Sequence, residues 1–278
     1  MKHALSFDIE DWFHIVDIPE LEDTSTWDVR SSIVEEKTDL ILAIVDEYEV
    51  KATFFVLGWI AKKYPVIAKK IVDAGHELGT HSFWHRRVYE LTPEIFFDDL
   101  KLSVDVLQNQ TGVKVNGFRA PSFSIIPGSE WAFGVIKEVG LTYDASLFPA
   151  SRGHGGYPCP QEVHLVSTSD GDMPELPMSV FKAGPLSIAF SGGGYLRALP
   201  YKVIEQGFTA FEKKGVPVVV YLHPRDFAAE QPVVPMPLHR KVKSYIGLSS
   251  TEQKLRRLLK KFEFTTCENV LKKHLAYI

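Results

Sequence analysis

The sequence is poor in cysteine and contains no long apolar run. Only two of its 278 residues are cysteines, Cys159 and Cys267, and nothing around them marks a pair. A secreted fold held by disulfides needs more cysteines than this, so we expect reduced thiols. No apolar stretch approaches the ~20 residues that span a bilayer, so we expect no transmembrane segment.

The first residues also lack the pattern of a secretory signal. Residues 1–5 run directly into the apolar segment that carries Asp8, which leaves no room for a signal peptide before it. Together with the reduced thiols, this predicts a cytoplasmic protein. The net charge of −4 gives no general attraction to nucleic acid, and no nucleic-acid-binding motif is present, so we expect no such partner. Nothing in the sequence predicts an oligomeric state.

Strand-like and helix-like segments alternate along most of the chain. The alternation predicts an α/β fold with a parallel sheet, and the length suits closure into one (β/α) barrel. The expected strands are 3–8, 52–57, 76–80, 113–118, 141–144 and 216–223, and the expected helices are 33–48, 65–74, 92–110, 130–139 and 200–214.

Two segments depart from this alternation. Residues 150–194 are rich in Gly, Pro and Ser, with short β-like pieces at 162–166 and 186–190, and we interpret them as an insertion at the rim. Residues 226–278 form a C-terminal extension with a proline-rich loop at 232–237 and helices at 251–261 and 267–275. We therefore expect a single domain, 1–278, with its core at about 3–225.

Polar residues end five of the apolar segments. They are Asp8, His81, Arg119, Asp144 and His223. In parallel α/β folds the carboxyl ends of the strands carry the working residues, so we expect these side chains to share one site. Carboxylates, imidazoles and a guanidinium together suit metal-assisted hydrolysis.

The metal ligands are expected from two clusters. His81 and His85 stand four apart, and on a helical turn both imidazoles would face one ion. A catalytic site needs a carboxylate as third ligand and an open position. Asp8 and Glu10 lie on one side of an extended strand, so one can bind metal while the other acts as base. Asp11 is the competing ligand if the strand ends early.

The remaining polar residues suggest acid–base roles. A buried Arg119 would hold an ionised carboxylate, such as Asp8, in orientation. His223 is a candidate general acid because its ordinary pKa lies near neutral pH. Asp144 is expected to orient the His223 ring, as the acid of a catalytic triad does, with Ser146 as a weaker candidate. Two aromatic residues beside these clusters, Trp84 and Phe123, are candidates for stacking on a sugar ring.

The motifs His-Ser-x-x-His at 81–85, Arg-x-Pro at 119–121 and Leu-x-His near 223 occur together in this order. The set resembles the polysaccharide deacetylases with a NodB-type domain, carbohydrate esterase family 4, over about residues 3–225. This resemblance implies a distorted (β/α) barrel of about seven strands and removal of N-acetyl groups. The segment 190–197 is similar to deacetylases found with exopolysaccharide export loci.

The first motif of that family usually has two adjacent aspartates, the first a base and the second a metal ligand. Here Asp8 is followed by Ile9, Glu10 and Asp11, which resembles a branch with Asp-x-acid spacing. The resemblance implies that Asp8 is the base and favours Glu10 over Asp11 as the ligand. One divalent ion is expected, with Zn²⁺ first. Co²⁺, Mn²⁺, Ni²⁺ and Fe²⁺ use overlapping ligands.

These observations predict a metal-dependent hydrolase acting on N-acetylated amino sugars of a polysaccharide or its lipid-linked precursor. A backbone N–H near Ser122 is expected to stabilise the oxyanion. One alternative is hydrolysis of a small cyclic amide, as in allantoinase-like or imidase-like proteins. The other is a non-catalytic glycan-binding module, although binding alone needs neither a base nor an acid.

A basic segment follows the last expected strand. Residues 236–261 contain eight Lys and Arg residues against one Glu, in a chain whose net charge is −4. Such a segment is typical of an amphipathic helix with a solvated basic face. It would also suit peripheral contact with an anionic membrane surface or a lipid-pyrophosphate substrate.

Overall fold

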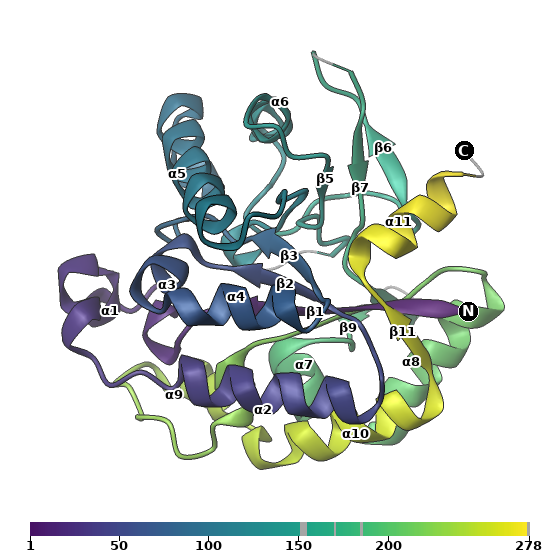
Figure 1. Cartoon of the computed structure of the whole chain (residues 1–278). Helices are drawn as coiled ribbons and strands as arrows, with labels where there is room; N and C mark the ends of the chain where they lie inside the picture. The colour runs from purple at the N-terminus through teal and green to yellow at the C-terminus, as the bar shows by residue number, and fades with distance from the viewer. Residues whose placement is uncertain (151–154, 170, 184–185, 277–278) are drawn as a thin grey trace.

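The computed structural model describes residues 1–150, 155–169, 171–183 and 186–276. Its main sheet has the order β10-β1-β2-β3-β4-β5-β7-β6, in which only β6 and β7 are antiparallel neighbours. The strands are β1 (Lys2–Ile9), β2 (Thr53–Val56), β3 (Glu77–Thr80), β4 (Gly117–Phe118), β5 (Tyr143–Asp144), β6 (His164–Val166), β7 (Met173–Glu175) and β10 (Val219–Leu222). The sheet is curled, with β1 through the middle of the molecule (Figure 1). The predicted distorted barrel is confirmed as this half-barrel.

Helices cover the outside of the curled sheet (Figure 1). The predicted caps explain the longest of them, α5: Thr92 Oγ1 accepts the Ile95 N–H at 3.4 Å, Pro93 takes the first position, and Gly112 ends the helix with φ +70°. The helices are α1 (Pro19–Glu22), α2 (Val34–Glu47), α3 (Gly58–Lys63), α4 (Pro65–Asp73), α5 (Pro93–Thr111), α6 (Trp131–Glu138), α7 (Gly193–Ala198), α8 (Tyr201–Lys213), α9 (Leu238–Tyr245), α10 (Thr251–Lys261) and α11 (Cys267–Leu275). Of these, α1, α3, α7 and α9 are additions to the prediction.

No helix of the described ranges combines the length and apolar character needed to cross a membrane.

Two strands of the sheet were absent from the prediction. β7 extends the sheet in parallel beyond β5, and β11 (Glu263–Thr265) pairs in parallel with the first residues of β1. Each of the two has only three residues. The pieces expected at 162–166 and 186–190 correspond to β6 and to β9 (Leu186–Ala189), which forms a hairpin with β8 (Val180–Ala183). Residues 151–154, 170 and 184–185 of the predicted insertion, and 277–278 of the predicted C-terminal extension, lie outside the described residues.

The strand register brings the chain segments that follow the strands to one edge. Ile9 pairs with Val56, Val56 with Thr80, Thr80 with Phe118, and Phe118 with Asp144. These strands therefore end in one row, and the polar residues after them emerge together. On the other side of β1, Phe7 pairs with Leu222. Asp8 follows Phe7 and His223 follows Leu222, so this register brings Asp8 and His223 side by side.

Candidate active site

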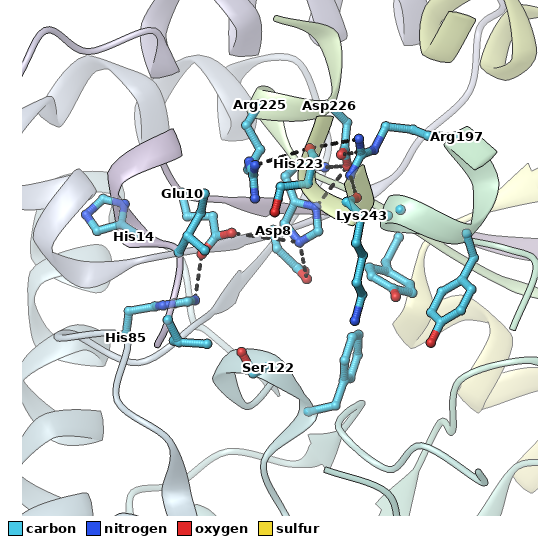
Figure 2. Close-up of a pocket in the computed structure, with 18 of the residues that line it drawn as sticks. Asp8, Glu10, His14, His85, Ser122, Arg197, His223, Arg225, Asp226 and Lys243 are labelled. Atoms are coloured by element: carbon cyan, nitrogen blue, oxygen red, sulfur yellow. Dashed lines mark hydrogen bonds and ion pairs between the residues drawn. The ribbon is translucent and has the colours of Figure 1, made fainter. Parts of the chain in front are cut away.

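Seven of the predicted functional residues line one cavity of about 480 Å³ at this edge of the sheet. Asp8, Glu10, His85 and His223 converge on it (Figure 2). Among the predicted residues, those that line the cavity are Asp8, Glu10, His81, His85, Ser122, Phe123 and His223.

Glu10, His81 and His85 form a cluster whose possible ligand atoms all lie within 4.8 Å of one another. The prediction that the two histidines share a helical turn is wrong, because they lie in a loop after β3. Ser82 and His85 have positive φ values of 66° and 54°, and this loop backbone brings the two imidazole rings to 5.1 Å between centroids. Left-handed backbone is uncommon for residues other than glycine and is concentrated at functional sites.

The donors of this cluster fit a divalent metal. His81 Nδ1 contacts the Arg119 carbonyl oxygen at 2.7 Å, an arrangement that leaves Nε2 free to bind an ion. Burial lowers the pKa of His81 to about 4, so the ring is neutral at neutral pH. Burial by itself would raise the pKa of Glu10, but the neighbouring imidazoles, His85 first among them, together hold that pKa well below its usual range. Two imidazoles and a carboxylate are the donor set of many catalytic zinc sites.

Glu10, and not the alternative Asp11, belongs to this cluster. The Asp11 carboxylate accepts hydrogen bonds from Trp12 N at 2.8 Å, Ser32 Oγ at 2.5 Å and Ile33 N at 3.2 Å. These contacts make Asp11 the N-cap of the short 3₁₀ helix Trp12–His14. Its carboxylate thus orders the loop that follows β1.

Asp8 and Arg119 form a buried ion pair. Arg119 Nη1 donates to Asp8 Oδ1 at 2.8 Å and to Ser6 Oγ at 2.7 Å, and Nε donates to the Ala145 carbonyl at 3.0 Å. The guanidinium also lies over the Phe55 ring, 4.3 Å from its centroid. Since both partners are buried, loss of either would leave an uncompensated charge. The predicted contact between Arg119 and the Asp8 carboxylate is therefore present.

His223 lies beside both acids of β1, but its orienting partner differs from the predicted one. His223 Nε2 is 3.7 Å from Asp8 Oδ2 and 3.9 Å from Glu10 Oε1. Its Nδ1 is 2.9 Å from Asp226 Oδ2, so Asp226 takes the place predicted for Asp144. Although burial opposes it, Asp226 raises the pKa of His223 above its usual value.

Asp226 is itself held in place by two further contacts. Its carboxylate accepts the His223 backbone N–H at 2.9 Å and forms an ion pair with Arg197 Nε at 2.9 Å. Burial opposes ionisation, but Arg197 and then His223 lower the pKa of Asp226 to about 2. Asp226 could have been predicted as the partner of His223 from the sequence. It lies three residues after His223, and Pro224 begins a 3₁₀ turn between them.

Asp144 supports a neighbouring loop. Its carboxylate accepts from Ser146 Oγ at 2.6 Å, and Ser146 Oγ accepts the Ala120 N–H at 2.7 Å. These bonds hold the backbone next to Arg119. Asp144 also faces Glu175, and burial, reinforced by the neighbouring carboxylate, raises the pKa of Glu175 well above its usual range.

The buried Asp144–Glu175 pair predicts a pH-dependent stability. An acid with a raised folded pKa binds more protons in the folded state, so its contribution is present below the unfolded pKa and is lost as pH rises. Glu175→Gln should therefore increase the free energy of unfolding at pH 8 by about 1–2 kcal/mol and change it little at pH 5. Urea unfolding at both pH values measures this. Glu138→Gln, on the exposed side of α6, is the control, and an equal effect of Glu175→Gln at both pH values would contradict a shared proton.

The predicted sugar-contacting aromatics occupy different places. Phe123 lines the cavity but is only 5% exposed, with its ring 4.8 Å from Tyr221 and 5.7 Å from Phe148. Trp84 lines an adjoining cavity of about 440 Å³ together with Trp27. The two cavities share His14, Ile15, Val16 and His85 as lining residues. Trp84 therefore lies beside the metal cluster's cavity and not within it.

Comparison with known proteins identifies the first half of the chain. Residues 23–144 match the family model "Polysaccharide deacetylase". Residues 23–144 are a polysaccharide deacetylase domain. Residues 145–272 match a second model, described as a domain of unknown function, DUF3473.

Curated relatives of this deacetylase domain match over a limited length. The chain is 31% identical to a peptidoglycan-N-acetylglucosamine deacetylase of Bacillus cereus over 98 residues, 35% of this chain and 36% of the relative. It is 32% identical to a peptidoglycan deacetylase of Helicobacter pylori over 109 residues, 38% of this chain and 36% of the relative. The chain thus spans about a third of the length of these relatives.

Solved structures show the same fold over nearly the whole chain. A protein from Mycobacterium smegmatis assigned as a polysaccharide deacetylase aligns with a TM-score of 0.66 and 19% identity, covering 99% of this chain and 90% of that one. A carbohydrate esterase family 4 pseudoenzyme from Bacillus anthracis aligns with a TM-score of 0.53 and 19% identity, covering 97% of this chain and 66% of that one. Because a protein described as a pseudoenzyme has this fold, function has to be argued from the site.

The deacetylase domain alone does not contain the whole site. Asp8 and Glu10 precede the matched residues, whereas His223, Asp226 and Arg197 lie in the segment that matches the domain of unknown function. His81, His85 and Arg119 belong to the deacetylase match. The parallel pairing of β1 with both β2 and β10 joins the three parts.

Proposed function

We propose that this protein is a metal-dependent hydrolase that removes N-acetyl groups from amino sugars of a polysaccharide or of its lipid-linked precursor. The observation that carries the proposal is one cavity in which the Glu10–His81–His85 cluster lies beside Asp8 and His223. Relatives named as deacetylases of peptidoglycan sugars support the reaction type. The free thiols of Cys159 and Cys267 support the cytoplasmic location expected from the sequence.

Glu10, His81 and His85 would hold the ion, which we propose is Zn²⁺, with Co²⁺, Mn²⁺, Ni²⁺ and Fe²⁺ as ions of overlapping preference. When bound, such an ion polarises the acetyl carbonyl and acidifies the attacking water.

The side chains around the cluster would move the protons. Asp8, held by Arg119, accepts a proton from the attacking water. The backbone N–H of Ser122, in a turn with φ 56° at the edge of the cavity, would stabilise the oxyanion. His223, oriented by Asp226, donates a proton to the leaving nitrogen as the C–N bond breaks. The products are acetate and a free amino sugar.

Acetate release from defined substrates tests the proposal. The metal-loaded protein should release acetate from N-acetylglucosamine oligomers or polymers and should leave allantoin and hydantoin intact. Hydrolysis of the cyclic amides alone would favour the imidase-like alternative. Glycan binding without acetate release would favour a non-catalytic module.

The general-acid role of His223 predicts a dependence on the leaving group. His223→Ala should lower amide hydrolysis by roughly 10²–10³-fold, within the range of a positioned acid. The loss should be much smaller for an activated acetyl ester, whose leaving group departs without a proton. Steady-state rates on both substrates decide the point, and equal losses would leave His223 with an orienting role only.

We also propose that the basic segment contacts an anionic membrane peripherally, through α9. Leu238, Val242 and Ile246 recur every fourth residue and are 76%, 53% and 40% exposed. On α10, by contrast, Lys254 donates to the Arg197 carbonyl at 2.6 Å and Arg256 Nε contacts Glu252 at 2.8 Å. A basic helix with exposed apolar side chains is typical of an interfacial helix.

Vesicle flotation tests this contact. The protein should bind vesicles containing phosphatidylglycerol and not pure phosphatidylcholine, and Leu238→Ser/Val242→Ser should weaken binding by roughly tenfold or more. The control is Val66→Ser/Ile95→Ser, which removes apolar side chains of similar exposure from α4 and α5. Unchanged binding of the α9 variant would contradict the proposal.

A further inference from the structure

One wall of the catalytic cavity is basic. Arg225 comes from the 3₁₀ helix after β10, and Arg240 and Lys243 come from α9. Lys243 extends into the cavity on the side away from His85, and Arg225 lies near Glu10 (Figure 2). None of the predicted acid–base steps uses these three cations.

Arg225 is the cation with the most unused hydrogen-bonding capacity. A guanidinium has five N–H donors. Within the described part of the chain, the Arg225 side chain makes a single hydrogen bond, from Nη2 to the Ser244 carbonyl at a long 3.4 Å, and its Nε is buried without a hydrogen-bond partner. Neighbouring Arg197, in contrast, donates from Nη1 to the Ser244 and Ile246 carbonyls at 3.0 and 2.9 Å and pairs with Asp226.

The carboxylates around this wall already have partners. Asp226 is committed to Arg197 and His223, Asp8 to Arg119, and Glu10 belongs to the metal cluster. Among the described residues, no carboxylate forms an ion pair with Arg225. A half-buried guanidinium beside open cavity space, with no described carboxylate within ion-pair distance, is suited to a ligand that brings its own negative charge.

The charge of the cavity supports the same conclusion. Its lining contains four Lys and Arg residues (Arg197, Arg225, Arg240 and Lys243) and three acids (Asp8, Glu10 and Asp226), although the whole chain has a net charge of −4. A divalent ion in the metal cluster would make the lining more positive. An excess of positive charge in a cleft favours a negatively charged ligand.

We propose that this wall is a subsite for an acidic group, a carboxylate or a phosphate, on the glycan whose N-acetyl group reaches the metal cluster. Arg225 is its central contact, with Lys243 beside it. Arg240 adds positive charge to the wall, but its Nη1 and Nη2 already donate to the Asp17 and Val16 carbonyls at 2.8 and 2.7 Å. The preferred substrate is then an acidic glycan, and neutral chitin-like oligomers are poorer substrates. This inference rests on the proposed deacetylase function and names the substrate class.

Three substrates test the inference on the metal-loaded, full-length protein. Neutral chitotetraose, a hyaluronan tetrasaccharide with carboxylates, and N-acetylglucosamine 1-phosphate are compared by acetate release. We expect kcat/KM for the carboxylate or the phosphate substrate to exceed that for chitotetraose by at least about tenfold, and the better of the two identifies the acidic group. Arg225→Gln should lower kcat/KM on that substrate by about 10–100-fold, mainly through KM, as loss of a charge-assisted hydrogen bond would. The loss on chitotetraose should be much smaller.

Two further variants keep the test decisive. Lys243→Gln changes an exposed residue and should lower the preference for the acidic substrate even if Arg225→Gln folds poorly. Arg257→Gln, which removes an arginine stacked on Tyr201, is the control and should keep the preference. Equal rates on neutral and acidic substrates, or equal losses on all substrates in Arg225→Gln, would overturn the subsite. Absence of acetate release from every substrate would instead refute the proposed function.

Discussion

The His81→Ala protein is expected to fold, to lose its bound metal and to lose acetate release. His81 contributes one of three clustered donors, and its ring is held for this role by the contact between Nδ1 and the Arg119 carbonyl. Removing only a partner of a ligand typically costs 10–100-fold in metal affinity, so loss of the ligand itself should cost at least about 100-fold. Elemental analysis after dialysis against a weak chelator measures the loss.

A matched histidine variant separates ligand loss from general damage. His164→Ala removes an imidazole from β6, outside the cluster, and should retain about one equivalent of metal. Circular dichroism shows whether both variants are folded. Near-stoichiometric metal in folded His81→Ala would show that the cluster is assigned wrongly.

The Asp8→Asn protein is expected to keep its metal and to lose about 10⁴-fold in turnover, the upper range for a positioned base. The amide retains the size of the side chain and can accept a hydrogen bond from Arg119, but it cannot take a proton from water. Asp8 lies outside the Glu10–His81–His85 cluster, so metal content should not change. Metal content and acetate release are measured on the same preparation.

The buried ion pair requires a stability control for this variant. Asp8→Asn leaves Arg119 without its counter-charge, and breaking a buried pair costs about 3–5 kcal/mol. Rates are therefore measured at a temperature at which circular dichroism shows the variant folded. If the metal were lost together with activity, Asp8 would be a ligand and another group would have to be the base.

The sequence was sufficient to predict which strand ends meet. A parallel sheet brings the carboxyl ends of its strands to one edge, so Glu10, His81, Arg119 and His223 could be placed together from their positions alone. The ends of α5 could also be predicted, because an N-cap threonine followed by proline begins a helix and a glycine with positive φ ends it.

The incorrect site predictions concern contacts that depend on loop geometry. The Asp144 partner was inferred from strand-end position, but the closest carboxylate to His223 Nδ1 comes from Asp226, one 3₁₀ turn further along the chain. His81 and His85 converge through positive φ at Ser82 and His85, which spacing does not show. Arg197 reaches Asp226 from α7, a helix that begins within a run of three glycines and that composition did not predict.

The structure also explains the first of the three glycines before Arg197, Gly192, for which the sequence predicted no role. The backbone at Gly192 pairs with Tyr221 of β10, and a Cβ there would lie 2.2 Å from the Tyr221 ring and 2.4 Å from its carbonyl oxygen. Only glycine permits this approach. The close contact places α7, and with it Arg197, beside the end of β10.

An anomalous diffraction map at the metal absorption edge, from crystals of protein grown with Zn²⁺, tests the central claim most directly. The account predicts one strong peak in contact with His81 Nε2, His85 Nε2 and the Glu10 carboxylate, with Asp8 and His223 beside it and outside the ligand set. A peak bound by Asp11 or Asp8 in place of Glu10, or no peak at His81 and His85, would contradict it.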